Sequence, residues 1–416
     1  MSAQFSPRAT CRLCGTGRLQ LALPLEHTPL GDHFVGAERL DQVQEAYPLD
    51  LMLCEDCGNV QLQHVVNPEI IYRDYTYTSS VSLGLVEHFQ RYADAVLQRV
   101  DPRPNVLVVE IGSNEGAMLR AFQKRGLTTL GVDPAREIAR CATAAGIETL
   151  PCYFTAEVAQ TIRDQRGPAA IVIANNVIAN IDDLSEVMRG LETLLAPQGV
   201  FVFETSYCLD VVQDALLDTI FHEHLTYFSV RPLVPFFRRH GMELIDAQRV
   251  ATKGGSLRVT AQRAGGSRPV ASSVAELQEL EASAGLNRLE TYRTLAARLD
   301  HRKRELHDVL GSWKAQGKTI AAYGAAVGLT TMIYQFGLGK FLSFIVDDNP
   351  GKHNLYSPGL HLPTLPSEAL YQRKPDYVVV LAWRYVDSIL QQHQAFLAQG
   401  GQFVTPLPEI RVIHGG

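Results

Sequence analysis

The chain has 416 residues, of which 46% are hydrophobic, and a formal net charge of −6 at pH 7. This length allows two or three domains, and the weak negative charge gives no general attraction to nucleic acid or anionic membranes. No apolar run approaches the roughly 20 residues that span a bilayer. We therefore expect a cytoplasmic monomer or small homo-oligomer with neither a nucleic-acid partner nor a membrane segment.

Four of the seven cysteines form two pairs, Cys11-x-x-Cys14 and Cys54-x-x-Cys57, and a glycine follows each pair. This spacing predicts a zinc ribbon, because two thiolates of one pair can converge on a tetrahedral ion. A site with four thiolates has no open position for catalysis, so the zinc would be structural. We assign this site to a domain of residues 1–75. Two disulfides are the alternative, and they are uncommon in a cytosolic chain.

Residues 106–118 predict a buried strand that ends in a glycine-rich turn and opens a helix. Four apolar residues precede Glu110, as in a parallel strand covered on both faces, and Gly112 and Gly116 would let the backbone approach a ligand. The spacing Glu-x-Gly-x-x-x-Gly differs from the three-glycine fingerprint of dinucleotide binders and from a phosphate loop. The turn therefore predicts a nucleotide-like ligand without a cradled phosphate.

Two further strands support this prediction. Asp133 ends the next apolar segment, where its carboxylate could accept both hydroxyls of a ribose. Together with residues 170–176, these segments resemble the class I S-adenosylmethionine-dependent methyltransferases, and we assign them to a doubly wound α/β domain of residues 76–268. An ordinary doubly wound domain that uses the turn for packing alone is the alternative. The resemblance implies that the cofactor is held by Glu110, Gly112, Asn114, Gly116, Asp133, Pro134, Asn175 and Asn176.

The densest cluster of ionisable and aromatic groups lies at residues 220–229. A positioned imidazole can take and release a proton near neutral pH, and a neighbouring carboxylate can fix its tautomer. Glu223 and His224 are thus candidates for proton transfer. A surface loop without a ligand is one alternative. A metal site is another, because His222 and His224 could share one face of an extended strand.

The last third of the chain, residues 269–416, predicts connecting helices near 274–315 followed by a second, smaller Rossmann-like sheet. Its first strand ends in Tyr323-Gly324-Ala325, where backbone amides could hold a phosphate, and its second ends in Asp347, suited to a ribose or base. A second dinucleotide cofactor and a purely structural repeat are the alternatives.

The order of these motifs, with Gly254-Gly255-Ser256-Leu257-Arg258 between them, resembles the nucleotide-sugar C-methyltransferases of deoxysugar pathways over nearly the whole chain. The resemblance implies a structural zinc, S-adenosylmethionine in the middle domain, and the nucleotide of a dTDP-linked 4-keto-6-deoxy sugar on the C-terminal domain. It implies C-methylation, most simply at C3, with His224 as the base that generates an enolate. Glu223 would orient this base or bind the sugar, and Tyr75 and Tyr77 would line the sugar pocket or pack between domains.

Two positions depart from the pattern of that family. Asn180 stands where a histidine is usual, and Phe221 stands where a tyrosine is common. Asparagine can donate a hydrogen bond to a keto oxygen but cannot move a proton near pH 7, and phenylalanine has no hydroxyl. Proton transfer would then fall to His224, His222 or a nearby tyrosine, and Lys253 could stabilise an enolate or a phosphate or be a solvated turn residue. An epimerase or isomerase using the same base, or a binding protein without turnover, are the alternative functions.

Overall fold

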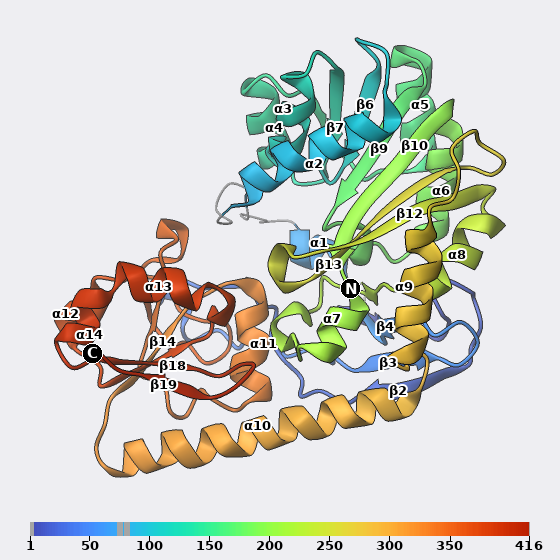
Figure 1. The fold of residues 1–416 in the computed structure, drawn as a ribbon. Helices are drawn as coiled ribbons and strands as arrows, with labels where there is room; N and C mark the ends of the chain where they lie inside the picture. The colour runs from blue at the N-terminus through green and yellow to red at the C-terminus, as the bar shows by residue number, and fades with distance from the viewer. Residues whose placement is uncertain (1–3, 73–77, 79–83, 416) are drawn as a thin grey trace.

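The computed structural model describes residues 4–72, 78 and 84–415. Figure 1 shows a large α/β sheet, a small sheet built around the N-terminus, and a second α/β sheet near the C-terminus. None of the helices formed by the described residues is both long and apolar enough to cross a membrane.

The small N-terminal sheet has four antiparallel strands in the order β11-β4-β3-β2. Its strands are β2 (Leu19–Leu23), β3 (Leu51–Cys54), β4 (Val60–Leu62) and β11 (Thr226–Tyr227). A separate pair joins β1 (Phe5–Pro7) to β5 (His64–Val66), a 3-10 turn spans η1 (Ala37–Arg39), and the short helix α1 (Pro68–Tyr72) follows. The strand β11 lies within residues 220–229, the segment that carries the candidate base His224 and is called the catalytic segment below. It completes the N-terminal sheet from more than 160 residues away along the chain.

The large sheet has seven strands in the order β12-β13-β10-β9-β6-β7-β8. Its core is parallel, and β13 and β12 form an antiparallel edge. This is the doubly wound sheet expected from the sequence. The strands are β6 (Leu107–Ile111), β7 (Thr128–Val132), β8 (Thr149–Leu150), β9 (Ala169–Asn175), β10 (Leu195–Ser206), β12 (Met242–Val250) and β13 (Ser256–Arg263).

Helices cover both faces of this sheet because successive side chains of a strand point to opposite faces. Val108 packs with α2 (Leu85–Val100) and α3 (Ala117–Gln123), whereas Val109 lies in the core on the other face. The remaining helices of this region are α4 (Arg136–Ala144), α5 (Ala156–Arg166), α6 (Leu184–Leu194), α7 (Cys208–Gln213) and α8 (Val230–Arg239). Short 3-10 turns lie at η3 (Ile178–Asn180), η4 (Leu217–Thr219) and η5 (Thr252–Gly254).

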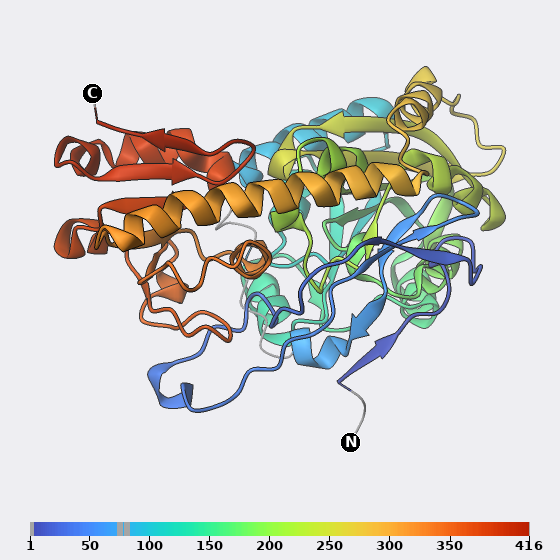
Figure 2. The same cartoon turned by 90° about the horizontal axis from the view of Figure 1, so that it is seen from below.

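The expected connecting helices are α9 (Ser272–Ser283) and α10 (Leu289–Ala315). Figure 2 shows α10 running along the underside of the molecule from the large sheet to the C-terminal sheet. Near its end the Trp313 ring stacks on Tyr377, with ring centroids 3.6 Å apart. The helix therefore anchors the C-terminal region by an aromatic contact.

The C-terminal sheet has six strands in the order β16-β15-β14-β17-β18-β19, parallel except for β19. This confirms the smaller Rossmann-like region. Its strands are β14 (Ile320–Tyr323), β15 (Ile345–Val346), β16 (Thr364–Leu365), β17 (Tyr377–Val380), β18 (Gln402–Thr405) and β19 (Arg411–Ile413). Its helical segments are α11 (Val327–Gln335), η6 (Pro350–Lys352), α12 (Ala369–Arg373), η7 (Trp383–Tyr385), α13 (Val386–Gln392) and α14 (Gln394–Ala398).

Candidate functional site

The four paired cysteines converge in the N-terminal sheet. Their Sγ atoms all lie within 4.8 Å of one another, as the ligands of one tetrahedral ion require. Two of the four cysteines are buried: Cys54, at the end of β3, is 0% exposed and Cys11 is 1% exposed. All four are free thiols, so the disulfide alternative is wrong. The donor set of Cys11, Cys14, Cys54 and Cys57 fits a structural zinc ion.

The zinc loop also contacts the predicted catalytic segment. Arg12, between the first two cysteines, is 4% exposed. Its guanidinium donates to the carbonyl oxygens of Leu62 at 2.8 Å and Leu225 at 3.2 Å, and to Asp182 at 2.8 Å. Leu225 directly follows His224, so one buried cation connects the metal loop to the segment that carries the candidate base.

The cofactor turn follows β6 with the geometry that its glycines predict. Gly112 has φ of +67°, and a Cβ there would lie 2.6 Å from Val177. Gly116 has φ of +78° and begins α3, and its Cβ would lie 2.6 Å from Ile147. Both positions therefore need glycine, because a side chain would be strained and would clash. The turn is fixed to the neighbouring strand by the Asn114 amide, which donates to the Asp133 carboxylate at 2.8 Å.

Buried polar atoms lie at the carboxyl ends of β6 and β9. The Asn175 Nδ2 donates to Glu110 Oε1 at 3.1 Å. Three further atoms, Glu110 Oε2, Asn175 Oδ1 and Ser113 Oγ, are buried without a hydrogen-bond partner among the described residues. Buried polar groups in native proteins are nearly always paired. This set fits the ammonium and hydroxyl groups of S-adenosylmethionine, and burial raises the pKa of Glu110 to about 8.

The other predicted cofactor residues border the same edge. Asp133 is 7% exposed, and its second oxygen accepts the Ala135 amide at 2.9 Å, so Pro134 lies inside a tight turn. Burial raises the pKa of the Asp133 carboxyl. Asn176 has φ of +53°, and its amide donates to the Glu204 carbonyl at 2.7 Å. Their roles toward the cofactor stay predictions.

His224 and His222 have different surroundings. The Nδ1 of His224 lies 2.9 Å from the Thr219 carbonyl, which fixes the neutral tautomer with a lone pair on Nε2. Burial, with a smaller contribution from the Lys253 cation, lowers its pKa to about 4. His222 is buried, and its Nε2 lies 3.2 Å from the carbonyl of Tyr47 in the N-terminal region. His222 therefore packs against the N-terminal region, and the cluster of three or more potential metal ligands found among the described residues is the cysteine quartet, without His222 or His224.

Asn180 and Glu223 both act on Tyr72. The Asn180 Nδ2 donates to the hydroxyl of Tyr72 at 3.1 Å, and its Oδ1 is buried without a partner among the described residues. Glu223 is 8% exposed and acts electrostatically on the same Tyr72. The Phe221 ring packs on His224, with centroids 4.0 Å apart. Tyr75 and Tyr77, predicted to line the sugar pocket, lie outside the described residues.

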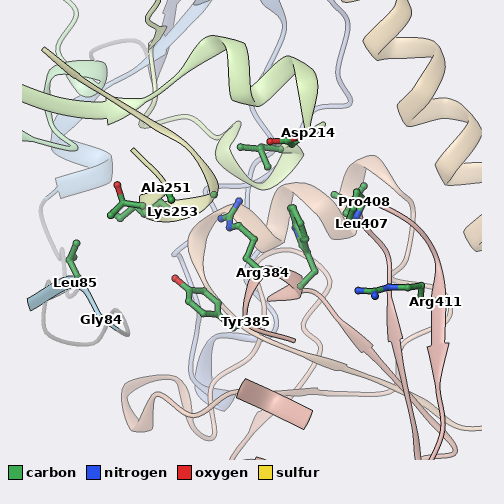
Figure 3. A pocket seen from close by; sticks show the side chains of 14 residues that line it. Gly84, Leu85, Asp214, Ala251, Lys253, Arg384, Tyr385, Leu407, Pro408 and Arg411 are labelled. Atoms are coloured by element: carbon green, nitrogen blue, oxygen red, sulfur yellow. The ribbon is translucent and has the colours of Figure 1, made fainter. Parts of the chain in front are cut away.

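A cavity of about 580 Å³ lies between the large sheet and the C-terminal sheet. Figure 3 shows Lys253 on one side of it and Arg384, Tyr385 and Arg411 on the other. Arg384 is held by an ion pair with buried Asp218 at 2.8 Å. The cavity is lined by Gly84, Leu85, Asp214, Leu216, Ala251, Thr252, Lys253, Gly254, Trp383, Arg384, Tyr385, Leu407, Pro408 and Arg411.

Sequence reasoning missed the C-terminal contribution to this cavity. The run Trp383-Arg384-Tyr385 directly follows β17, at the carboxyl end of a parallel strand. Ligands bind at the carboxyl end of the strands in open α/β sheets, so an arginine flanked by two aromatic residues at this position could have indicated a binding site from the sequence alone. Tyr72 was also missed, because nothing local to α1 indicates that its hydroxyl reaches η3.

The turn predicted to hold the nucleotide is largely occupied by the protein itself. The Ala325 amide donates to the Asp347 carboxylate at 2.6 Å, and the Tyr323 hydroxyl contacts Asp348 at 2.7 Å on the opposite side. A Cβ on Gly328 would lie 1.7 Å from the Asp218 carbonyl oxygen, so the first turn of α11 is covered. Gly324, with φ of +111°, has no side chain and so allows the backbone to lie close to Ala382. Carboxylates of the protein itself therefore bind the Ala325 amide and the Tyr323 hydroxyl, and the role of this turn toward a nucleotide stays a prediction.

Comparison with known proteins agrees with this geometry. Family models match three segments: a zinc binding domain at residues 11–72, a methyltransferase domain at 85–247 and a C-methyltransferase C-terminal domain at 251–408. The C-methyltransferase NovU of Streptomyces niveus is 35% identical over 408 residues, covering 98% of this chain and 97% of the relative. The chain belongs to the C-methyltransferase family. As a member, it is an S-adenosylmethionine-dependent C-methyltransferase with a zinc-binding N-terminal domain.

Solved structures resemble parts of this C-methyltransferase. Magnesium protoporphyrin IX methyltransferase from Synechocystis with bound S-adenosylhomocysteine is 16% identical, with a TM-score of 0.35, covering 47% of this chain and 92% of that chain. The PH0226 protein of Pyrococcus horikoshii is 14% identical, with a TM-score of 0.38, covering 47% and 98%.

Proposed function

We propose that this C-methyltransferase methylates a nucleotide-linked 4-keto-6-deoxy sugar at C3. The main support is the setting of His224. Its Nδ1 is held by the Thr219 carbonyl, so the lone pair on Nε2 can act as a base. Lys253, which borders the cation-lined cavity, acts electrostatically on His224. A base near an anion site, in a chain that uses an activated methyl donor, suits alkylation of a weakly acidic carbon.

The reaction would begin when His224 removes the proton from the carbon next to the ketone. The electron pair of the broken C–H bond forms an enolate, whose oxygen needs hydrogen-bond donors. S-adenosylmethionine, when bound, supplies a methyl group on a positively charged sulfur. Glu110, Asn175 and Asp133 would hold the cofactor, and Glu223 would bind the sugar or orient the base.

The cavity supports a nucleotide-linked substrate. Lys253, Arg384 and Arg411 line it from three separate elements. Cations of this kind bind phosphate oxygens, and arginine can do so through two parallel hydrogen bonds. Tyr385, which is 39% exposed, and Trp383 offer rings for a nucleobase. We therefore propose that the cavity holds the diphosphate and base, with dTDP as the first nucleotide to test.

The deciding experiment incubates the zinc-loaded protein with S-adenosylmethionine and dTDP-, GDP- and CDP-linked 4-keto-6-deoxy sugars in deuterated water. We expect one sugar to gain a methyl group with formation of S-adenosylhomocysteine, and NMR to locate the methyl group on C3. Family membership favours this outcome over an epimerase, an isomerase or a binding protein. Deuterium uptake without methyl gain on every sugar would contradict the proposal.

A further inference from the structure

Tyr72 and Asn180 form a hydrogen-bonded pair although they are 108 residues apart in the chain. The pair lies beside the segment that carries the candidate base, because the Leu225 amide donates to the carbonyl of Ala179 at 2.7 Å. Tyr72 ends α1, after the zinc-binding region, and Asn180 ends η3, after β9. Burial raises the pKa of Tyr72 well above its ordinary value, and the Glu223 carboxylate raises it further. The phenol therefore stays protonated at neutral pH and can donate a hydrogen bond.

Two side chains near this segment offer few hydrogen-bond donors to a substrate oxygen. The Phe221 ring, which packs on His224, has no polar hydrogen, and Asn180 already directs one N–H to Tyr72. The buried Asn180 Oδ1 has no partner among the described residues. A buried acceptor of this kind is normally satisfied when the site is complete, which indicates a ligand with a hydroxyl hydrogen beside it.

We propose that Tyr72 is a catalytic residue that donates its phenolic hydrogen to the enolate oxygen, and that Asn180 is the positioning residue that holds it. This inference rests on the proposed function. The C–H bond breaks, its proton passes to His224 Nε2, and its electron pair becomes the enolate, whose oxygen accepts the Tyr72 hydrogen bond. As the reacting carbon takes the methyl group, the methyl–sulfur bond of the bound cofactor would break with its electron pair left on sulfur, and the enolate oxygen becomes a ketone again. The Tyr72 proton is never transferred, so the raised pKa suits the role.

The test compares full-length, zinc-loaded Tyr72→Phe with wild type on the sugar that wild type methylates. Removal of one donor to a developing oxyanion costs about 10²–10³-fold in kcat. We expect a loss of this size in kcat and a similar loss in deuterium exchange at the reacting carbon, with cofactor Kd unchanged. The isotope effect for a deuterated reacting carbon should rise, because enolate formation becomes rate-limiting. Tyr334→Phe is the matched control, since its hydroxyl binds the Pro358 carbonyl in the C-terminal region.

A second variant separates donation from packing. Asn180→Leu should lower kcat, and adding it to Tyr72→Phe should cost little more, because both changes remove one coupled pair. Exchange and methylation within threefold of wild type in Tyr72→Phe would overturn the inference. So would fully independent losses in the double variant. Failure of the proposed function itself would appear differently, as a wild-type protein that neither exchanges nor methylates any ketosugar.

Discussion

At the scale of single residues, burial decides the protonation state of the groups that the sequence identified. Glu110 and His224 were both predicted as site residues by type and position. Burial favours the neutral form of each, so the pKa of Glu110 rises to about 8 and that of His224 falls to about 4. The free enzyme at pH 7 therefore holds a protonated carboxyl and an unprotonated imidazole.

Cofactor binding should depend on pH through Glu110. A cationic ammonium group favours the ionised carboxylate, so the wild-type affinity should rise with pH up to about 8, by at most about tenfold per unit for one proton. Glu110→Gln cannot ionise and is the control. Calorimetry at several pH values should show this additional rise in wild type alone. Identical pH dependence in both proteins would contradict the role of Glu110.

Replacement of His224 should stop the first chemical step. We expect His224→Gln to abolish deuterium exchange at the sugar carbon and to leave cofactor Kd nearly unchanged. In wild type the acid limb of kcat/KM should lie below pH 5, because the free enzyme has a lowered pKa at His224. Lys253→Met should move this limb upward, since it removes a cation that lowers the pKa. A wild-type limb near the ordinary value of about 6.5 would argue against this base.

At the scale of elements, local patterns predicted the strands and turns but missed one pairing. The glycine turns, the doubly wound sheet and the connecting helices follow from periodicity and glycine spacing. The strand β11 has only two residues, and Thr226 pairs with Gln61 across the chain. Two residues carry no periodic signal, so the attachment of the catalytic segment to the zinc-binding sheet was not predictable.

This attachment gives Arg12 a testable positioning role. Arg12→Met should retain zinc, because no thiolate is lost, but should slow exchange and methylation by releasing the Leu225 carbonyl next to His224. Arg8→Met is the control, since Arg8 pairs with the same Asp182 at 2.7 Å but is more exposed. Metal analysis and exchange rates would check both variants. Equal rates in Arg12→Met and wild type would leave the zinc loop with a purely structural role.

At the scale of the whole molecule, three regions meet around the cavity and the catalytic segment. The N-terminal region also reaches the C-terminal one, where Val35 pairs with Tyr356 and Lys352 pairs with Asp32 at 2.6 Å. Figure 2 shows this N-terminal chain beside the C-terminal region. Loss of the zinc should therefore disturb more than its own sheet.

Removal of one zinc ligand should lower metal content and stability together. We expect Cys54→Ser to destabilise the fold by about 3 kcal/mol, because a buried metal site is lost. The control is Cys141→Ser, which changes an exposed thiol outside the cluster. Metal analysis and thermal unfolding would measure both effects. A metal-free Cys54→Ser protein with wild-type stability and activity would contradict the structural assignment.

The sequence by itself determined the thiol quartet, the Glu110–Gly116 turn, the doubly wound sheets and the choice of Glu223 and His224 as candidates. These features depend on local spacing and on periodicity along one segment. The tertiary structure alone decided that His222 packs against Tyr47, that Tyr72 reaches Asn180, and that Arg384 and Arg411 face Lys253 across a cavity. Packing between segments far apart in the chain sets these contacts and the burial that shifts each pKa, and no local pattern encodes it.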